Sequence, residues 1–331
     1  MSQQLYPVEK VDALIRSGAS LLLAGEEAPL RRLPKGNWIA GTIPYFMTSA
    51  GGCVDRERIF VTELPSNLTL AGIRRYGDSD IARIYSDLPS NAFGVLIAPA
   101  SSPVHLSFAL NAPNYEKFAV RPLIGWISGV HLSQINSATP KVFDGTSAEA
   151  LDKQAVVMHV ALPPGKVAEL GIINIFKESD GPAITFPSSG FTATMVDVDG
   201  EKRNLAEFIK EKGLDTRAPL VADYCGTSIN VSFQSVDHEK GEVKFYAPVF
   251  EGLKYRHAKP ASDYVTQFVS RLPRGLGKRL AFSCNCILNY LHSSLEGRKT
   301  GGIVGPITFG EIAYQLLNQT MVYVTIDNAH R

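Results

Sequence analysis

Short apolar runs separated by glycine, proline and polar residues dominate the chain, and they predict a protein built largely from β-strands. Residues 229–236 and 242–249 alternate apolar and polar side chains on either side of a turn at residues 237–241, which is typical of a hairpin. Residues 38–46 and 58–63, separated by a Ser-Ala-Gly-Gly stretch, are expected to form a longer hairpin. More continuous apolar runs predict buried strands at residues 21–23, 94–98, 121–132, 154–162, 280–284 and 321–326.

Amphipathic helices are predicted at three places, and a fourth helix carrying Ile287, Leu288, Leu291 and Leu295 is predicted directly after the strand at residues 280–284. Residues 8–15 carry apolar side chains at helical spacing. Asn204, followed three residues later by Glu207, forms a capping pattern for a second helix, which Gly213 ends. Ser262 is expected to cap the third.

Length and repetition both bear on the fold class. A chain of 331 residues exceeds the usual size of a single core, so two domains or two halves are expected. Residues 38–47, 123–132 and 303–312 each place a glycine early in a β-type run, which favours duplication, although chance similarity of small buried strands explains it equally well. Residues 166–175 fit a helix or a strand. We expect an α+β fold with mixed or antiparallel sheets flanked by helices, in two related halves.

Composition and charge exclude several classes of partner. The formal net charge of +1 provides no field for nucleic acid or anionic lipid. Four cysteines, Cys53, Cys225, Cys284 and Cys286, are too few for a disulfide framework and lack zinc-ligand spacing. The leucines at residues 21–23 are too short an apolar run for a signal peptide or a membrane span. A cytoplasmic protein is therefore expected.

One acidic residue stands out near the C-terminal end of the sequence. Glu311 lies between apolar neighbours, and burying it without a partner costs several kcal/mol. Asn318, Gln319 and Thr320 precede the next strand and are candidates for that partner. Pro306, in the run just before Glu311, offers no N–H to a sheet, so that strand is expected at an edge or with a bulge.

The same region resembles a known family. The string GPITFGEIAYQLLNQTMVYVTI at residues 305–326 is similar to the C-terminal signature of the FIST family, sensory input modules of bacterial signalling proteins. FSCNCILNYL at residues 282–291, the run at residues 192–262 and PLIGWISGVHLSQINSATPKVFDG at residues 122–145 are similar to other family segments, so about two thirds of the chain is covered by the resemblance. The resemblance implies a FIST N-like half at residues 1–190, a FIST C-like half at residues 191–331, and ligand sensing in signal transduction through a separate partner protein.

By this interpretation, Glu311 and the Asn318 amide orient a small polar ligand such as an amino acid. Tyr45, Trp126 and Phe309 provide apolar walls, and Cys284 completes the set. A purely architectural role is the open alternative, in which Glu311 accepts backbone N–H groups and the protein is a ligand-free scaffold.

Enzymatic chemistry is a further alternative, with Glu311 or Cys284 as the reactive group. Cys284 and Cys286 lie at a strand end near a helix start, where a thiol pKa can fall, but small apolar fillers are the favoured interpretation. The common catalytic signatures are absent from the sequence, so a non-catalytic protein is favoured.

The resemblance implies haem as an alternative cofactor, because it extends to members that bind haem and sense gas. His131, His159 and His257 lie in strand-like sequence, and His257 is the preferred axial ligand because Arg256 beside it can pair with a propionate. Buried imidazoles bonded to backbone carbonyls are the favoured interpretation of these histidines, and no other cofactor is expected.

Overall fold

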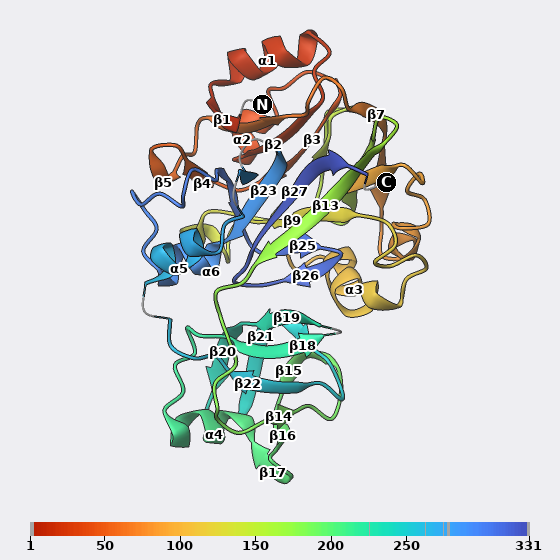
Figure 1. Cartoon of the computed structure of the whole chain (residues 1–331). Helices are drawn as coiled ribbons and strands as arrows, with labels where there is room; N and C mark the ends of the chain where they lie inside the picture. The colour runs from red at the N-terminus through yellow and green to blue at the C-terminus, as the bar shows by residue number, and fades with distance from the viewer. Residues whose placement is uncertain (1–2, 225, 262, 274, 277–278, 330–331) are drawn as a thin grey trace.

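The computed structural model describes residues 3–224, 226–261, 263–273, 275–276 and 279–329, and it divides the chain into two lobes (Figure 1). The larger lobe, here called the main body, contains the strands of residues 3–173 and 280–328 in three six-stranded sheets. The smaller lobe, here called the inserted lobe, comprises residues 184–257 and enters the chain between two strands of one main-body sheet.

The first sheet of the main body contains one parallel pair among antiparallel neighbours. β2 and β3 run parallel, with Leu21 opposite Trp38, and α1 packs its buried Val8, Val11 and Ile15 against this sheet. The bounds of α1 are Val8–Arg16. In sheet order the strands are β1 (Gln3–Tyr6), β6 (Ile59–Glu63), β2 (Leu21–Gly25), β3 (Trp38–Thr42), β10 (Val142–Asp144) and β11 (Glu149–Leu151).

The expected long hairpin between residues 38–46 and 58–63 is wrong. Its first segment contains two strands, β3 and β4, which belong to different sheets, and β3 pairs with β2 and β10 rather than with β6. The turn at residues 49–50 closes a shorter hairpin of β4 and β5, in which Thr48 faces Gly51. Both hairpins fit the local apolar pattern, and the long-range parallel pairing with β2 decides between them.

The other two main-body sheets cover one face of the central sheet, and α3 covers the opposite face. Contacts join β3 to β8 and β9 on the first side, and β27 to β25 and β9. Helix α3 (Pro103–Asn111), capped by Ser102, covers the opposite face. In sheet order the strands are β26 (Gln315–Leu317), β25 (Glu311–Ala313), β9 (Leu123–Ser128), β8 (Ala92–Pro99), β12 (Ala155–Ala161) and β7 (Thr69–Tyr76).

The third sheet joins distant parts of the chain. Residues 166–173 form a strand, β13, which pairs along its whole length with β27, from Lys166 opposite Asn328 to Ile173 opposite Met321. In sheet order the strands are β13 (Lys166–Ile173), β27 (Met321–Asn328), β23 (Leu280–Cys286), β24 (Gly305–Thr308), β4 (Tyr45–Thr48) and β5 (Gly51–Val54).

The expectation that the Pro306 strand is an edge or bulged is also wrong, because β24 lies inside this sheet. Each of its two neighbours pairs with a different half of β24: β23 pairs only with Ile307 and Thr308, whereas β4 pairs only with Gly305 and Pro306. No neighbour therefore uses the full length of β24, and the sheet accommodates a residue without an N–H.

The inserted lobe contains one six-stranded and one three-stranded sheet, and α4 packs against one strand of each, β17 and β21. Asn204 caps α4 by accepting from the Glu207 N–H at 3.0 Å, and Gly213 ends it with φ of +60°, as predicted. The hairpin predicted at residues 229–236 and 242–249 is confirmed in part: β20 pairs with β21, but residues 229–231 belong to β19, which pairs with β18 in the other sheet. The elements are α4 (Leu205–Lys212), β17 (Glu201–Asn204), β16 (Met195–Val198), β14 (Ile184–Thr185), β22 (Lys254–His257), β18 (Leu220–Tyr224), β19 (Thr227–Val231), β15 (Gly190–Ala193), β21 (Glu242–Val249) and β20 (Phe233–Asp237).

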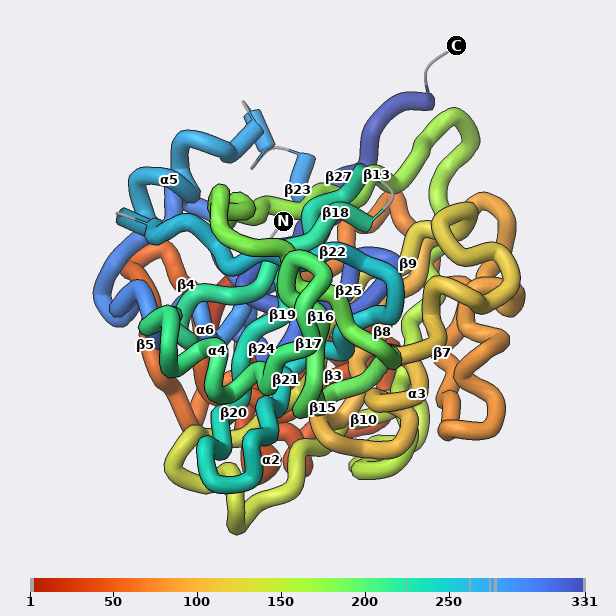
Figure 2. The backbone as a smooth tube through the Cα atoms, turned by 90° about the horizontal axis from the view of Figure 1, so that it is seen from below, coloured from red at the N-terminus to blue at the C-terminus, as the bar shows by residue number. Residues whose placement is uncertain are grey.

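Two short helices, α5 (Tyr264–Ser270) and α6 (Ile287–His292), follow the inserted lobe in the chain and lie on one side of the main body (Figures 1 and 2). Asp263 caps α5, whereas the predicted cap Ser262 lies outside the described residues. Within the described ranges no helix has the length and apolar character needed to cross a membrane.

The α+β class with mixed and antiparallel sheets flanked by helices is confirmed. The boundaries of the sheets differ from the predicted division into halves at residues 1–190 and 191–331. β13 pairs with β27, and residues 184–257 form sheets of their own. The relationship between the two halves stays a prediction.

Candidate functional site

Glu311 begins β25 and is completely buried between the central sheet and the third sheet. Its backbone lies opposite Trp126 of β9 and Leu317 of β26. The strand contacts β27 and β23 across the layer, so the carboxyl group faces the interior of the main body.

Among the described residues, neutral donors hold the carboxyl group and no cation contacts it. Thr320 donates to Glu311 Oε2 from its backbone N–H at 3.2 Å and from its hydroxyl at 2.9 Å. Burial raises the Glu311 pKa to about 8, although the Thr320 bonds and the Cys286 thiol counteract part of that rise. Glu311 is therefore mostly protonated at neutral pH. The expected contact with the triplet at residues 318–320 is observed, and Thr320 provides it.

A second group of buried polar side chains lies behind Thr320, and it was not anticipated. Asn289 Nδ2 donates to the Thr320 carbonyl at 3.3 Å and to Asn285 Oδ1 at 3.0 Å. Asn285 Oδ1 also accepts from the Cys286 N–H at 2.8 Å, and the Tyr264 hydroxyl lies 3.3–3.4 Å from the Asn285 amide. The sequence signal was the spacing of Asn285 and Asn289 across a strand-to-helix junction.

The residues predicted to surround Glu311 fall into two places. Trp126 and Cys284 lie in the same interior layer, and the Cys284 thiol donates to the Gly125 carbonyl at 3.5 Å. Tyr45 and Phe309 pack instead against residues 129–132: the Tyr45 hydroxyl accepts from the Leu132 N–H at 3.0 Å, and Phe309 occupies the space beside Gly129.

Asn318 and Gln319 are also buried, but they face other partners than the Glu311 carboxyl group. Asn318 Nδ2 donates to the Leu317 carbonyl at 3.1 Å. Gln319 extends to the inserted lobe, where its Oε1 accepts from the Ser232 hydroxyl at 2.8 Å and its Nε2 donates to the Arg217 carbonyl at 3.0 Å.

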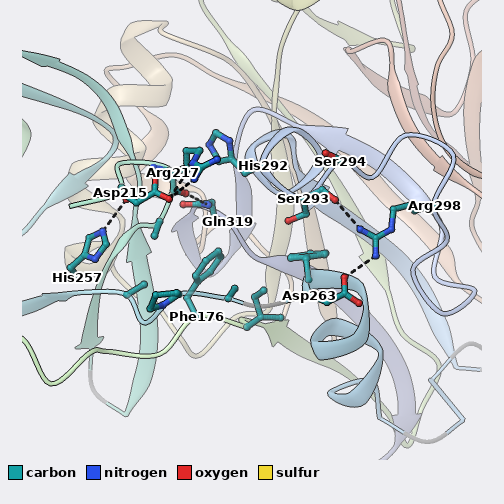
Figure 3. A pocket seen from close by; sticks show the side chains of 16 residues that line it. Phe176, Asp215, Arg217, His257, Asp263, His292, Ser293, Ser294, Arg298 and Gln319 are labelled. Carbon is teal, nitrogen blue, oxygen red and sulfur yellow. Dashed lines mark hydrogen bonds and ion pairs between the residues drawn. The ribbon is translucent and has the colours of Figure 1, made fainter. Parts of the chain in front are cut away.

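A pocket of about 490 Å³, here called the interlobe pocket, lies beside Gln319 at the junction of the two lobes (Figure 3). Glu311 does not line it, but Gln319 and Tyr264, which belong to the polar groups around Glu311, do. The inserted lobe and its connecting segments provide Ile175, Phe176, Asp215, Arg217, Ala218, His257, Ala258, Pro260 and Ala261, and the main-body side provides Asp263, Tyr264, His292, Ser293, Ser294, Arg298 and Gln319.

Each side of the interlobe pocket carries one ion pair. Arg217 Nη2 lies 2.8 Å from Asp215 on the inserted lobe, and Arg298 Nη2 lies 2.8 Å from Asp263 on the other side. Side-chain hydrogen bonds, from Arg217 to Asp215 and from Thr266 and Arg298 to Asp263, lower the pKa of each carboxyl group to about 2. The charges of these four residues cancel, so the two ion pairs present separated charges and no net charge.

Two of the eight non-glycine residues with positive φ among the described residues lie at the same place. Gln319 and Ser294 both line the interlobe pocket, and both are non-glycine residues in the left-handed region, with φ of +49° and +50°. Such residues persist only where their surroundings hold them, and they are enriched at functional sites.

Of the histidines predicted as haem ligands, His257 and His131 have other partners, whereas the buried Nε2 of His159 has no hydrogen-bond partner among the described residues. His257 lines the interlobe pocket, but its Nε2 lies 3.0 Å from the Asp215 carbonyl, and Arg256 contacts the Gly181 carbonyl and Glu178. His131 stacks on Tyr45 with ring centroids 5.6 Å apart. His159 is buried in β12, where burial lowers its pKa to about 4.

The two cysteines near Glu311 are unsuited to nucleophilic chemistry as they stand. Both are fully buried, and burial raises the pKa of each thiol well above its usual value, so the thiolate is scarce at neutral pH. No group of three potential metal ligands occurs among the described residues.

These observations define a two-lobed α+β protein with a charged pocket at the lobe junction and a neutral buried acid behind it. The chain belongs to DUF6976, a family of unknown function, which matches residues 6–327. No curated protein and no solved structure matches the chain.

Proposed function

We propose that this protein is a small-ligand-sensing module, FIST-like in its role, which binds a small zwitterionic metabolite such as an amino acid and acts in signal transduction through a separate partner. The interlobe pocket is the proposed binding site. The main support for the proposal is that two ion pairs lie on opposite walls of that pocket, Asp215 with Arg217 and Asp263 with Arg298.

The chemistry of the walls matches this class of ligand. A volume of about 490 Å³ lies within the range of small-molecule sites. Arginine N–H groups bind a carboxylate and aspartate oxygens bind an ammonium group, whereas the cancelling charges do not favour a ligand of high net charge. Ile175, Phe176 and Pro260 offer apolar contact to the rest of the ligand.

The two-lobed form supports sensing. A ligand that contacts both walls favours one relative position of the lobes, and a partner protein that contacts both lobes detects that position. The cytosol is the proposed location, because Cys53, Cys284 and Cys286 are free thiols, as is usual in a reducing compartment.

A thermal-shift screen against the standard amino acids tests the proposal. A ligand at one hundred times its Kd stabilises the folded state by about 2.7 kcal/mol, which raises the melting temperature measurably. The same screen on Ala218→Trp, in which an indole fills the interlobe pocket, is expected to lose the shift, because Ala218 lines it.

Ser235→Trp is the matched control, since it places the same ring on an exposed position of β20 away from the interlobe pocket. It is expected to keep the shift. An absence of any shift in the native protein, or a shift that survives Ala218→Trp, counts against the proposed site.

A further inference from the structure

One short loop connects the interlobe pocket to Glu311. Residues 318–320 lie between β26 and β27, in the interior of the protein, and all three side chains are buried. Gln319 lines the interlobe pocket, whereas Thr320 next to it holds the Glu311 carboxyl group.

The contacts of Gln319 point in two directions. Toward the inserted lobe, its side chain bonds Ser232 at 2.8 Å and the Arg217 carbonyl at 3.0 Å, and its own carbonyl accepts from Asn230 Nδ2 at 3.3 Å. Toward the main body, its backbone N–H contacts the Cys286 thiol, which in turn contacts Glu311. Figure 3 shows Gln319 beside Arg217, the residue whose guanidinium group carries one of the pocket charges.

The backbone of Gln319 indicates that these contacts fix its position. A φ of +49° suits glycine and is unfavourable for glutamine, so the side-chain bonds to the inserted lobe offset a local cost of about 1 kcal/mol. Loss of those bonds is expected to let the loop relax toward a less strained backbone, and Thr320 moves with it.

We propose that Gln319 is a positioning residue that couples the two lobes, so that a displacement of the inserted lobe at Gln319 changes the hydrogen bonding of Glu311. The proposal deepens the sensing function proposed above and rests on it, because it names the route by which occupancy of the interlobe pocket reaches the main body. The reverse also follows, since coupling between two sites is reciprocal.

The groups that face Glu311 make its titration a clean reporter of this coupling. Cys284 and Cys286 of β23 and Tyr264 of α5 are the titratable groups that interact with it, and burial raises the pKa of each above the neutral range. Between about pH 5 and pH 9 only the carboxyl group itself changes charge in this cluster.

The experiment follows the carboxyl carbon of Glu311 by NMR in protein labelled with ¹³C at the glutamate side-chain carboxyl, with the signal assigned by its absence in Glu311→Gln. The test variant is Ser232→Ala, which removes one Gln319 bond from the inserted lobe and touches no atom of Glu311. We expect its titration midpoint to move by about half a pH unit or more. Ser235→Ala, an exposed serine of the same strand region, is expected to leave the midpoint unchanged.

An identical midpoint in Ser232→Ala, Ser235→Ala and the native protein overturns the proposal. If Ser232→Ala does not fold, Gln319→Gly takes its place, because glycine adopts the left-handed backbone without strain and lacks the side-chain bonds. The titration contains no ligand, so an unchanged midpoint contradicts the coupling and says nothing about the interlobe pocket. If no amino acid binds in the thermal-shift screen, the proposed binding site is wrong, and the coupling through Gln319 can still be measured.

Discussion

Glu311 and Asp215 carry the same ionisable group, a carboxyl group, in two environments that shift its pKa in opposite directions. Asp215 lies at the interlobe pocket beside a cation, and the bonds from Arg217 lower its pKa to about 2. Glu311 lies in the main body among neutral donors, and burial raises its pKa to about 8. The pocket therefore presents fixed charge and the buried site suppresses it, although both belong to one connected set of residues.

The largest expected effect is the pH dependence that Glu311 imposes on stability. Its folded-state pKa of about 8 lies above the ordinary value of 4.5, so the folded protein keeps a proton that the unfolded chain releases between these values. The stabilisation is complete below about pH 4.5 and is lost as the pH rises toward 8, by on the order of 5 kcal/mol over the window.

Urea unfolding across roughly pH 5 to pH 9 measures this effect, with Glu311→Gln as the control. The amide matches the protonated carboxyl group in shape and accepts from Thr320, so the variant is expected to lack this pH dependence and to be the more stable protein at high pH. Parallel curves for the two proteins would contradict an uncharged Glu311.

The next largest effect is expected for Glu311→Ala. This variant leaves a cavity and two buried Thr320 donors without an acceptor, at a cost of about 3 kcal/mol in the free energy of unfolding. Denaturant unfolding at pH 6, beside Glu311→Gln at the same pH, separates loss of packing from loss of the ionisable group. Equal stability of the two variants would show that the site tolerates an empty space.

The smallest effect is expected for Asp215→Asn. The side chains of Asp215 and Arg217 are 50% and 72% exposed, so solvent screens the pair and its loss costs less than about 1 kcal/mol. Because the pKa of Asp215 is lowered, its contribution is present above the ordinary value of 3.8 and disappears only as the pH falls toward 2. If unfolding experiments near neutral pH show a large loss of stability, the prediction is wrong and the Asp215–Arg217 pair contributes to the stability of the fold.

The sequence was sufficient where local chemistry decides structure. Asn204 and Gly213 bound α4 as predicted, since a cap and a left-handed terminus depend on neighbouring residues. Glu311 was recognised as a buried acid from its apolar flanks, and the loop that follows β26 was recognised as its partner. Both inferences depend on residues fewer than ten positions apart.

Contacts between segments that are not adjacent in the sequence limited the prediction of strand pairing and of the site. The assignment of β3 failed because β3 pairs in parallel with β2, the strand before it, and antiparallel with the distant β10, rather than with β6. The interlobe pocket combines residues 215–218, 257–261 and 292–298 with Gln319, and no spacing in the sequence connects these segments. Cys286 and Tyr264 were missed as neighbours of the acid for the same reason.

The pairing of β13 with β27 has a consequence for synthesis of the protein. β13 leaves the ribosome long before β27, and at ordinary translation rates it waits on the order of ten seconds for its partner. The inserted lobe is complete within that interval, so we expect it to fold first while β13 remains an open edge that chaperones can cover. Since β27 contacts β25 across the layer that buries Glu311, we expect Glu311 to take up its proton only after β27 has docked.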